Sequence, residues 1–330
     1  MGQFAPLPAL AETLRFDPAA RDAIAGDDRR IVVVGAGGWI GRMALAGLHD
    51  ALGEAEMHRR VVAFGSSTRG VDIGLGRCVM QHPLARLADL PAAPTLLLHL
   101  AFLTKDKVDG MAQDAYCAAN RALSKTVLGA LDRIGVERLF LASSGAAAHA
   151  ADPHADAALR LYGALKAEDE ARFGDWARAG ENRRAVIARI FNLSGPFINK
   201  HQTYALASFI RDALAHRPIE VRAPVRVVRS YVALRELLSL VLVKLTAEQG
   251  ATVTRFDSGG DPVELGEIAV EVASRFGTRV ARHPMLDGKA NIYAGDGDGY
   301  ARLLERHGIA PVPFSDQIAE TASFLAAYAE

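Results

Sequence analysis

Cysteine is scarce in this chain, and no apolar run is long enough to cross a membrane. The only cysteines among its 330 residues, Cys78 and Cys117, lie far apart and lack the spacing of metal ligands. We therefore expect two free thiols, a reducing compartment and no bound metal. No stretch approaches the roughly 20 apolar residues that span a bilayer, and residues 1–30 lack the basic head and apolar run of a signal peptide. These absences predict a cytoplasmic protein without a membrane partner.

Net charge is absent as well. The 38 basic and 38 acidic side chains cancel, so no overall field draws the protein to nucleic acid or to an anionic surface. Apolar residues make up 50% of the chain and charged residues 23%, which is ordinary for a globular protein. Any anionic ligand must be held by local groups, and the expected partner is a small molecule.

Short apolar runs alternate with longer helical patterns through the first two thirds of the chain. The runs are continuously apolar, which is typical of parallel strands covered on both faces. Alternating strand and helix predicts an α/β protein with a Rossmann-type, doubly wound parallel sheet. The expected strands are 30–34, 61–64, 95–100, 138–142 and 185–190, with a weaker one at 77–80. The expected helices are 40–52, 106–134 and 157–179.

The pattern changes after Gly195-Pro196. Helices are expected at 204–216, 234–246, 264–276, 299–307 and 316–327, joined by short strands such as 225–232 and 252–257. We interpret 30–195 as a dinucleotide-binding domain that carries the catalytic residues. Residues 196–330 are expected to form a smaller, mixed α/β substrate-binding cap, some segments of which return to the first domain. Residues 1–29 are interpreted as a peripheral N-terminal extension.

A glycine-rich turn follows the first expected strand. The run Ile31-Val-Val-Val-Gly35-Ala-Gly-Gly38-Trp39-Ile40-Gly41 leads directly from strand to helix. Glycines allow backbone to approach a pyrophosphate, whose charge is favoured by the N–H groups at the start of a helix. In the first strand-to-helix turn of an alternating pattern, this loop predicts a dinucleotide site. Its expected contacts are Gly35, Gly38, Trp39, Ile40 and Gly41.

The second strand is followed by hydroxyl groups and an arginine. An acidic side chain at its end would bind the adenosine ribose of NAD, but the sequence there is Gly65-Ser66-Ser67-Thr68-Arg69. Ser66, Ser67 and Arg69 could instead hold a 2′-phosphate, because arginine pairs well with phosphate oxygens. NADP(H) is therefore favoured over NAD(H). The alternative is a solvated loop arginine.

A tyrosine and a lysine four residues apart lie further along, at Tyr162 and Lys166. On a helix they share one face. A free tyrosine has a pKa of about 10, and a nearby ammonium would lower it toward the working range. Alone, this spacing also fits a surface helix whose lysine extends into solvent. Ser143 and Ser144 end the preceding strand, where open α/β sheets bind ligands, so Ser144, Tyr162 and Lys166 are the expected catalytic group.

From Arg30 onward the chain resembles the extended short-chain dehydrogenase/reductase family, also called the NAD-dependent epimerase/dehydratase family, in its nucleotide-sugar-modifying branch. The motifs that carry the resemblance occur in the family's order. They are the Gly-x-x-Gly-x-x-Gly loop at Gly35, Leu98-His-Leu-Ala101, Asn120, Ser143-Ser144, Tyr162 with Lys166, Arg189-Ile-Phe-Asn192-Leu-Ser-Gly195-Pro196 and Arg229-Ser-Tyr-Val-Ala-Leu-Arg-Glu-Leu-Leu.

The resemblance implies further site residues and an oligomeric state. It implies that the cofactor is also contacted by Leu100, Ala101, Phe102, Asn120, Tyr162 and Lys166. It implies that the substrate is contacted by Ser144, Asn192 and Arg229, although Arg229 also fits a solvated strand arginine. His99 fits a packed strand residue better than a general base. The long helices after the fourth and fifth strands imply a homodimer.

The chain departs from the family pattern in places. The 4,6-dehydratases of the family have Asp-Glu just after the serine region, whereas this chain has Ala146-Ala-Ala148. Dehydratase activity is therefore not expected. Relatives also have an acidic residue at the position of Ser230.

We therefore expect an NADP-dependent reductase that acts on a keto group of a nucleotide-linked sugar, with Tyr162 as proton donor. The alternative is an epimerase that oxidises a hydroxyl transiently, and a further alternative is a non-catalytic dinucleotide sensor.

Overall fold

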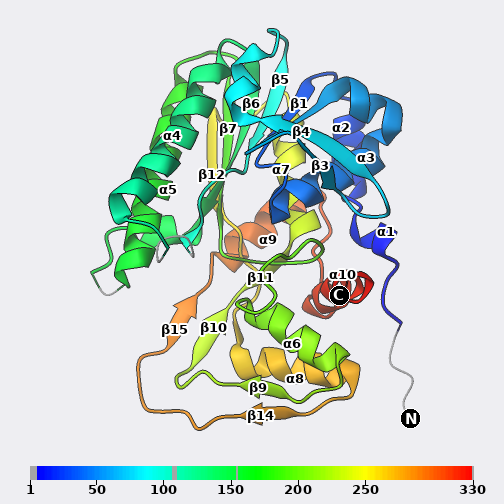
Figure 1. Ribbon diagram of the computed structural model, residues 1–330, viewed down its shortest axis with the longest axis vertical. Helices are drawn as coiled ribbons and strands as arrows, with labels where there is room; N and C mark the ends of the chain where they lie inside the picture. Colours follow the sequence, from blue (N-terminus) through cyan, green and yellow to red (C-terminus); the bar gives the residue numbers. More distant parts are fainter. Residues whose placement is uncertain (1–5, 106–109, 154, 329–330) are drawn as a thin grey trace.

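An eight-stranded sheet forms the centre of the protein (Figure 1). The computed structural model describes residues 6–105, 110–153 and 155–328. The strand order is β12-β7-β6-β5-β1-β2-β4-β3, and all neighbours pair in parallel except the β3–β4 hairpin. The strands are β1 Arg30–Val34, β2 Val61–Gly65, β3 Arg69–Asp72, β4 Cys78–Pro83, β5 Thr95–His99, β6 Val136–Ser144, β7 Arg184–Ile190 and β12 Val253–Asp257.

The predicted doubly wound α/β fold is confirmed, and its topology locates the site. Strand β1 pairs with β2 on one side and with β5 on the other. The chain therefore winds outward in both directions from β1, and ligands of such sheets bind outside the carboxyl ends of the strands near this reversal. Strand β6 is longer than expected, so Ser143 and Ser144 are its last residues.

Each face of the sheet has its own hydrophobic core because successive strand residues point to opposite sides. In β1, Ile31 and Val33 face one cluster, while Val32 and Val34 face the other. The first cluster includes residues of α3 (Trp39–Arg60) and α7 (Leu234–Thr246). The second includes residues of α4 (Gln113–Leu131) and α5 (Ala157–Arg178). Figure 1 shows α4 and α5 on the side of the sheet away from α2 (Pro18–Ala25) and α3.

The predicted helices are found with some shifted ends. Helix α3 continues beyond the expected end at 52, across a break at Gly53 where φ is 72°. Helix α4 begins at Gln113 rather than at 106, and residues 106–109 lie outside the described part of the chain. Among the helices of the described residues, none combines the length and the apolar character that crossing a membrane requires.

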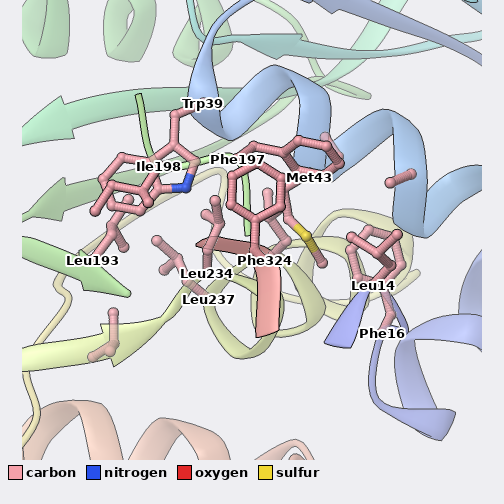
Figure 2. Packing of buried hydrophobic residues seen from close by; sticks show 14 of the residues in the cluster. Leu14, Phe16, Trp39, Met43, Leu193, Phe197, Ile198, Leu234, Leu237 and Phe324 are labelled. Carbon is pink, nitrogen blue, oxygen red and sulfur yellow. The ribbon is translucent and has the colours of Figure 1, made fainter. Parts of the chain in front are cut away.

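The N-terminal segment belongs to the core and is not peripheral, contrary to our expectation. It forms α1 (Leu10–Thr13) and α2 (Pro18–Ala25), and Leu14 and Phe16 between them are each 3% exposed. Figure 2 shows both side chains in the same buried cluster as Met43 of α3 and Phe324. Because burial of a Leu or Phe side chain contributes about 1.5–3 kcal/mol, this segment stabilises the sheet's first face.

The residues after 195 form a smaller mixed region below the large sheet (Figure 1). Strand β12 and helix α7 return to the large sheet, where β12 pairs with β7. The expected strand 225–232 is instead two strands in different sheets, separated at the buried Ser230. The elements are β8 Asn192–Ser194, α6 Ala205–Leu214, β9 Ile219–Val221, β10 Val227–Arg229, β11 Tyr231–Ala233, β13 Val263–Glu264, α8 Leu265–Phe276, β14 Val280–Arg282, β15 Asn291–Tyr293, α9 Gly297–Arg306 and α10 Phe314–Ala327.

Candidate active site

The glycine loop lies at the carboxyl end of β1 and leads into α3. Gly35 has φ 93°, and a Cβ there would lie 2.7 Å from the Ala101 nitrogen and 2.8 Å from the Leu100 carbonyl carbon. Gly38 is the N-cap of α3. Because glycine has no side chain, no capping group accepts hydrogen bonds from the first N–H groups of the helix. This close-packed turn in front of a helix N-terminus fits the pyrophosphate of a dinucleotide.

The side chain of Trp39, the first residue of α3, is held in contacts within the protein. The Trp39 indole is 9% exposed and donates from Nε1 to the Pro196 carbonyl at 2.6 Å. Its ring also packs edge-on against Tyr204, with centroids 5.7 Å apart. The side chain therefore ties the glycine loop to the segment after β8, and the backbone N–H at the start of α3 is the group that can face a pyrophosphate.

We call the group of Gly65, Ser66, Ser67, Arg69 and Gln81 the ribose end, after the contact that the sequence predicts for Ser66, Ser67 and Arg69. Ser66 and Ser67 are exposed in a bend after β2. Arg69 is the first residue of strand β3, not a loop residue, because 69–72 pair with β4 as a hairpin. A Cβ on Gly37 would collide with Nη2 of Arg69, so the guanidinium lies against the glycine loop. Gln81 was missed by our sequence analysis because its position depends on strand pairing.

The segment after β5 passes beside the glycine loop. Leu100, Ala101 and Phe102 are partly buried, and Leu100 N donates to the Val34 carbonyl at 2.8 Å. Asn120 is 1% exposed, and its Oδ1 accepts from Leu103 N at 2.8 Å. Its amide nitrogen points to the carbonyls of Leu103 and Tyr116. Asn120 thus fixes the course of this segment through backbone contacts.

We call the cluster of Ser144, Tyr162, Lys166 and Tyr293 the catalytic end, after the role that the sequence predicts for the first three. Ser144 is 6% exposed, and its Oγ lies 3.2 Å from the Tyr293 hydroxyl. Tyr162 lies in the first half of α5. Burial raises the pKa of Tyr162 above its ordinary value, while the nearby Ser144 hydroxyl acts in the opposite direction. The structure therefore brings the predicted serine and tyrosine together.

The expected lowering of the tyrosine pKa by Lys166 is not found. The Lys166 ammonium is buried and donates to the Ala142 carbonyl at 2.8 Å. It also lies 3.8 Å from the centroid of the Phe102 ring, which itself packs edge-on against Tyr162 with centroids 5.6 Å apart. Burial lowers the pKa of Lys166 to about 8. The Lys166 ammonium is directed toward β6. Loss of hydration, and not the lysine, therefore has the largest influence on the pKa of Tyr162.

Beside Ser144, the other serine belongs to a buried ionic network. Ser143 donates to Glu170 at 2.6 Å. The Glu170 carboxylate, 2% exposed, pairs with Arg189 at 2.8 Å and with Arg255 at 3.0 Å. Since β6, β7 and β12 each supply one partner to a single carboxylate of α5, the network fixes the helix that carries Tyr162 against the sheet.

Tyr293 was not predicted by the sequence analysis. It lies in β15, 149 residues from Ser144 along the chain. Its ring packs against Phe191 at 4.9 Å and lies 6.2 Å from the His149 ring. Burial raises the pKa of Tyr293. An aromatic group thus covers the Ser144 hydroxyl from the side of the C-terminal region.

Besides Ser144, the predicted substrate residues Asn192 and Arg229 both contact the strand that carries Tyr293. Asn192 donates to the Ser230 carbonyl at 3.0 Å and to the Tyr293 carbonyl at 3.3 Å. Arg229 donates to Val228 and to both oxygens of Asn291. Both residues therefore lie beside the catalytic end, and their substrate contacts stay predictions.

His99 is a packed strand residue, as expected. It is 2% exposed, and its ring lies 5.0 Å from that of Phe173. Within the described residues neither ring nitrogen has a hydrogen-bond partner, and burial lowers its pKa to about 3. The same residues contain no group of three His, Cys, Asp or Glu side chains placed to hold a metal ion.

Sequence comparison agrees with this architecture. The sequence model of the family described as 'NAD dependent epimerase/dehydratase family' matches residues 31–257. This range includes the glycine loop, both serines, Tyr162 and Lys166. The chain belongs to the NAD-dependent epimerase/dehydratase family. This match confirms the resemblance inferred from the motifs. A comparison with curated protein sequences gives no significant match.

Solved structures that resemble this family member cover nearly the whole chain. An epimerase from Methanothermobacter thermautotrophicus is 17% identical, with a TM-score of 0.69 over 94% of this chain and 96% of that one. UDP-glucose 4-epimerase from Thermotoga maritima, solved with UDP-glucose, is 18% identical, with a TM-score of 0.69 over 91% and 100%. A dTDP-glucose 4,6-dehydratase double mutant from Streptomyces venezuelae, solved with NAD, is 18% identical, with a TM-score of 0.67 over 91% and 97%. These likenesses establish the fold.

Proposed function

We propose that the protein is an NADP-dependent reductase that acts on a keto group of a nucleotide-linked sugar. The proposal rests on the side chains present and absent at the ribose end of the site. No carboxylate follows β2, and Arg69 lies against the glycine loop without an acidic partner among the described residues. A guanidinium in that place suits a 2′-phosphate. Family membership and relatives solved with UDP-glucose support a nucleotide sugar as substrate.

A bound nicotinamide dinucleotide would supply the hydride to the carbonyl carbon. We expect Ser144 to hydrogen-bond the carbonyl oxygen and Tyr162 to give that oxygen its phenolic proton. Because burial raises the pKa of Tyr162, the phenol stays protonated at neutral pH, as a proton donor must. Lys166 keeps its ammonium beside the same helix face and can contact a ribose hydroxyl. Asn192 and Arg229 are proposed to contact the sugar and its diphosphate.

An epimerase is the second candidate, because structural relatives at a TM-score of 0.69 include a UDP-glucose 4-epimerase. Such an enzyme oxidises and re-reduces the sugar with the same groups. The two candidates differ in whether the cofactor is consumed. A homodimer through α4 and α5 also stays a proposal, which sedimentation of the purified protein tests.

The test is to incubate the purified protein with NADPH and a panel of keto-sugar nucleotides, and to follow the absorbance of the reduced nicotinamide. A stoichiometric loss of NADPH with one of them is expected. Conversion of a sugar nucleotide to its epimer without net loss or gain of NADPH would overturn the reductase proposal in favour of the epimerase.

A further inference from the structure

Gln81 occupies the space that a side chain at the end of β2 would fill. A Cβ placed on Gly65 would lie 2.5 Å from both Cδ and Nε2 of Gln81. Gln81 comes from the neighbouring strand β4, which pairs with β2 so that Ala63 lies opposite Gln81 and Gly65 opposite Pro83. A larger residue at position 65 would therefore have to displace the carboxamide supplied by β4.

The Gln81 carboxamide is buried but only half satisfied. The residue is 1% exposed, and its Nε2 donates to the Ser67 carbonyl at 3.0 Å. Its Oε1 has no hydrogen-bond partner among the described residues. A buried carbonyl oxygen without a partner is unfavourable because it has lost its hydrogen bonds to water, so such an oxygen in a ligand site is a candidate acceptor for a ligand hydroxyl.

Oε1 lies close to both Gly65 and the glycine loop, and it is the Gln81 atom nearest to a Cβ placed on Gly65. A Cβ on Gly37 would lie 3.2 Å from Gln81 Oε1 and 3.4 Å from the Arg69 guanidinium carbon. Gln81 and Arg69 are also opposite each other in the β3–β4 hairpin. One hairpin therefore presents a neutral acceptor and a cation together beside the glycine loop, where the adenosine ribose of a dinucleotide would be bound.

We infer that Gln81 is a specificity-determining residue of the ribose end, which accepts a hydrogen bond from an adenosine-ribose hydroxyl while Arg69 pairs with the 2′-phosphate. This inference rests on the proposed dinucleotide function and adds a residue to it. A carboxylate in the same place would accept the same hydrogen bond but repel the phosphate, since like charges brought together are strongly unfavourable. The carboxamide keeps the acceptor and removes the repulsion.

The test is a fluorescence titration of the purified protein with NADPH and with NADH, which measures binding and needs no substrate. The Gln81→Glu variant keeps almost the same side-chain shape but adds a negative charge, which should weaken NADPH binding most. The ratio of the NADH dissociation constant to the NADPH dissociation constant should therefore fall at least about tenfold. In Gln81→Met, which keeps the length but not the acceptor, both dinucleotides should bind a few-fold more weakly. Gln249→Glu adds the same charge at an exposed turn and should leave the ratio unchanged.

A compensating pair tests the same inference if Gln81→Glu does not fold. Gly65→Asp alone must displace the Gln81 carboxamide, whereas Gly65→Asp with Gln81→Ala removes the obstruction. The double variant should bind NADH more tightly than NADPH. A ratio that stays within twofold of the unaltered protein in Gln81→Glu, or in the folded double variant, overturns the role of Gln81 and leaves the proposed function intact. An unaltered protein that binds neither dinucleotide overturns both.

Discussion

The catalytic end and the ribose end of the site differ in how their polar groups are paired. At the catalytic end, Ser144 contacts both Tyr162 and Tyr293, and Lys166 donates to Ala142. At the ribose end, Gln81 Oε1 is unpaired, and Arg69 forms no ion pair within the described residues. Polar groups that bond one another are pre-positioned for chemistry. Groups left unpaired are instead available to a ligand, so the two ends should respond differently to substitution.

The largest effect is expected at the catalytic end. Tyr162→Phe removes the proposed proton donor, and because general acid catalysis contributes about 10²- to 10⁴-fold, kcat should fall by a factor in that range. The phenol is not part of the ribose end, so the dissociation constant for NADPH should change less than about threefold. Steady-state kinetics and fluorescence titration measure the two quantities. Undiminished turnover would contradict the assignment of Tyr162.

The next largest effect is expected at the ribose end. Arg69→Ala removes a charge-assisted contact worth about 1.5–3 kcal/mol, so NADPH should bind roughly 10- to 100-fold more weakly, while NADH binding changes little. Titrations at low and high salt should show that the difference between the two cofactors shrinks with ionic strength. Arg86→Ala, an exposed arginine paired with Asp89, is the control. Equal losses for both cofactors would rule out a 2′-phosphate partner.

A smaller effect is expected from the hydroxyl that contacts Ser144. Tyr293→Phe keeps the ring against Phe191 but removes the hydroxyl 3.2 Å from Ser144. One hydrogen bond is worth about 1 kcal/mol, so kcat should fall about tenfold or less, with no change in the dissociation constant for NADPH. Tyr328→Phe, in a partly exposed stack on Phe324, should be neutral. If the two variants behave alike, Tyr293 has no part in positioning Ser144.

The smallest effect concerns stability beneath the catalytic end. His99 has a lowered pKa of about 3 when folded, against about 6.5 when unfolded. The contribution of neutral His99 to the free energy of unfolding is complete above about pH 6.5 and is lost as the pH falls toward 3. In that range the histidine binds a proton in the unfolded chain but not in the folded protein. Between pH 7.5 and 5.5 the free energy of unfolding should fall by about 1 kcal/mol more in the unaltered protein than in His99→Leu. Urea unfolding at both pH values measures this, and identical losses would show that His99 does not titrate as stated.

Much of the fold and part of the site could be predicted from local sequence. The apolar run and glycines at 31–41 mark a strand, a turn and a helix start, because each depends on neighbouring residues alone. Ser144 and the Tyr162 helix were predicted in the same way, from a strand end and from helical spacing. The burial of Leu14 and Phe16 was missed because two apolar residues in a short segment do not reveal what they pack against.

By itself the sequence determined the order of elements, the position of the glycine loop, and the serine and tyrosine of the catalytic end. Only the tertiary structure decided which residues from distant strands complete each end. Strand pairing brings Gln81 into the space above Gly65, and β15 brings Tyr293 onto Ser144. Burial also decided that the pKa of Tyr162 rises rather than falls. Periodicity and motif spacing are local properties, whereas register, contact across strands and loss of hydration depend on how the whole chain packs.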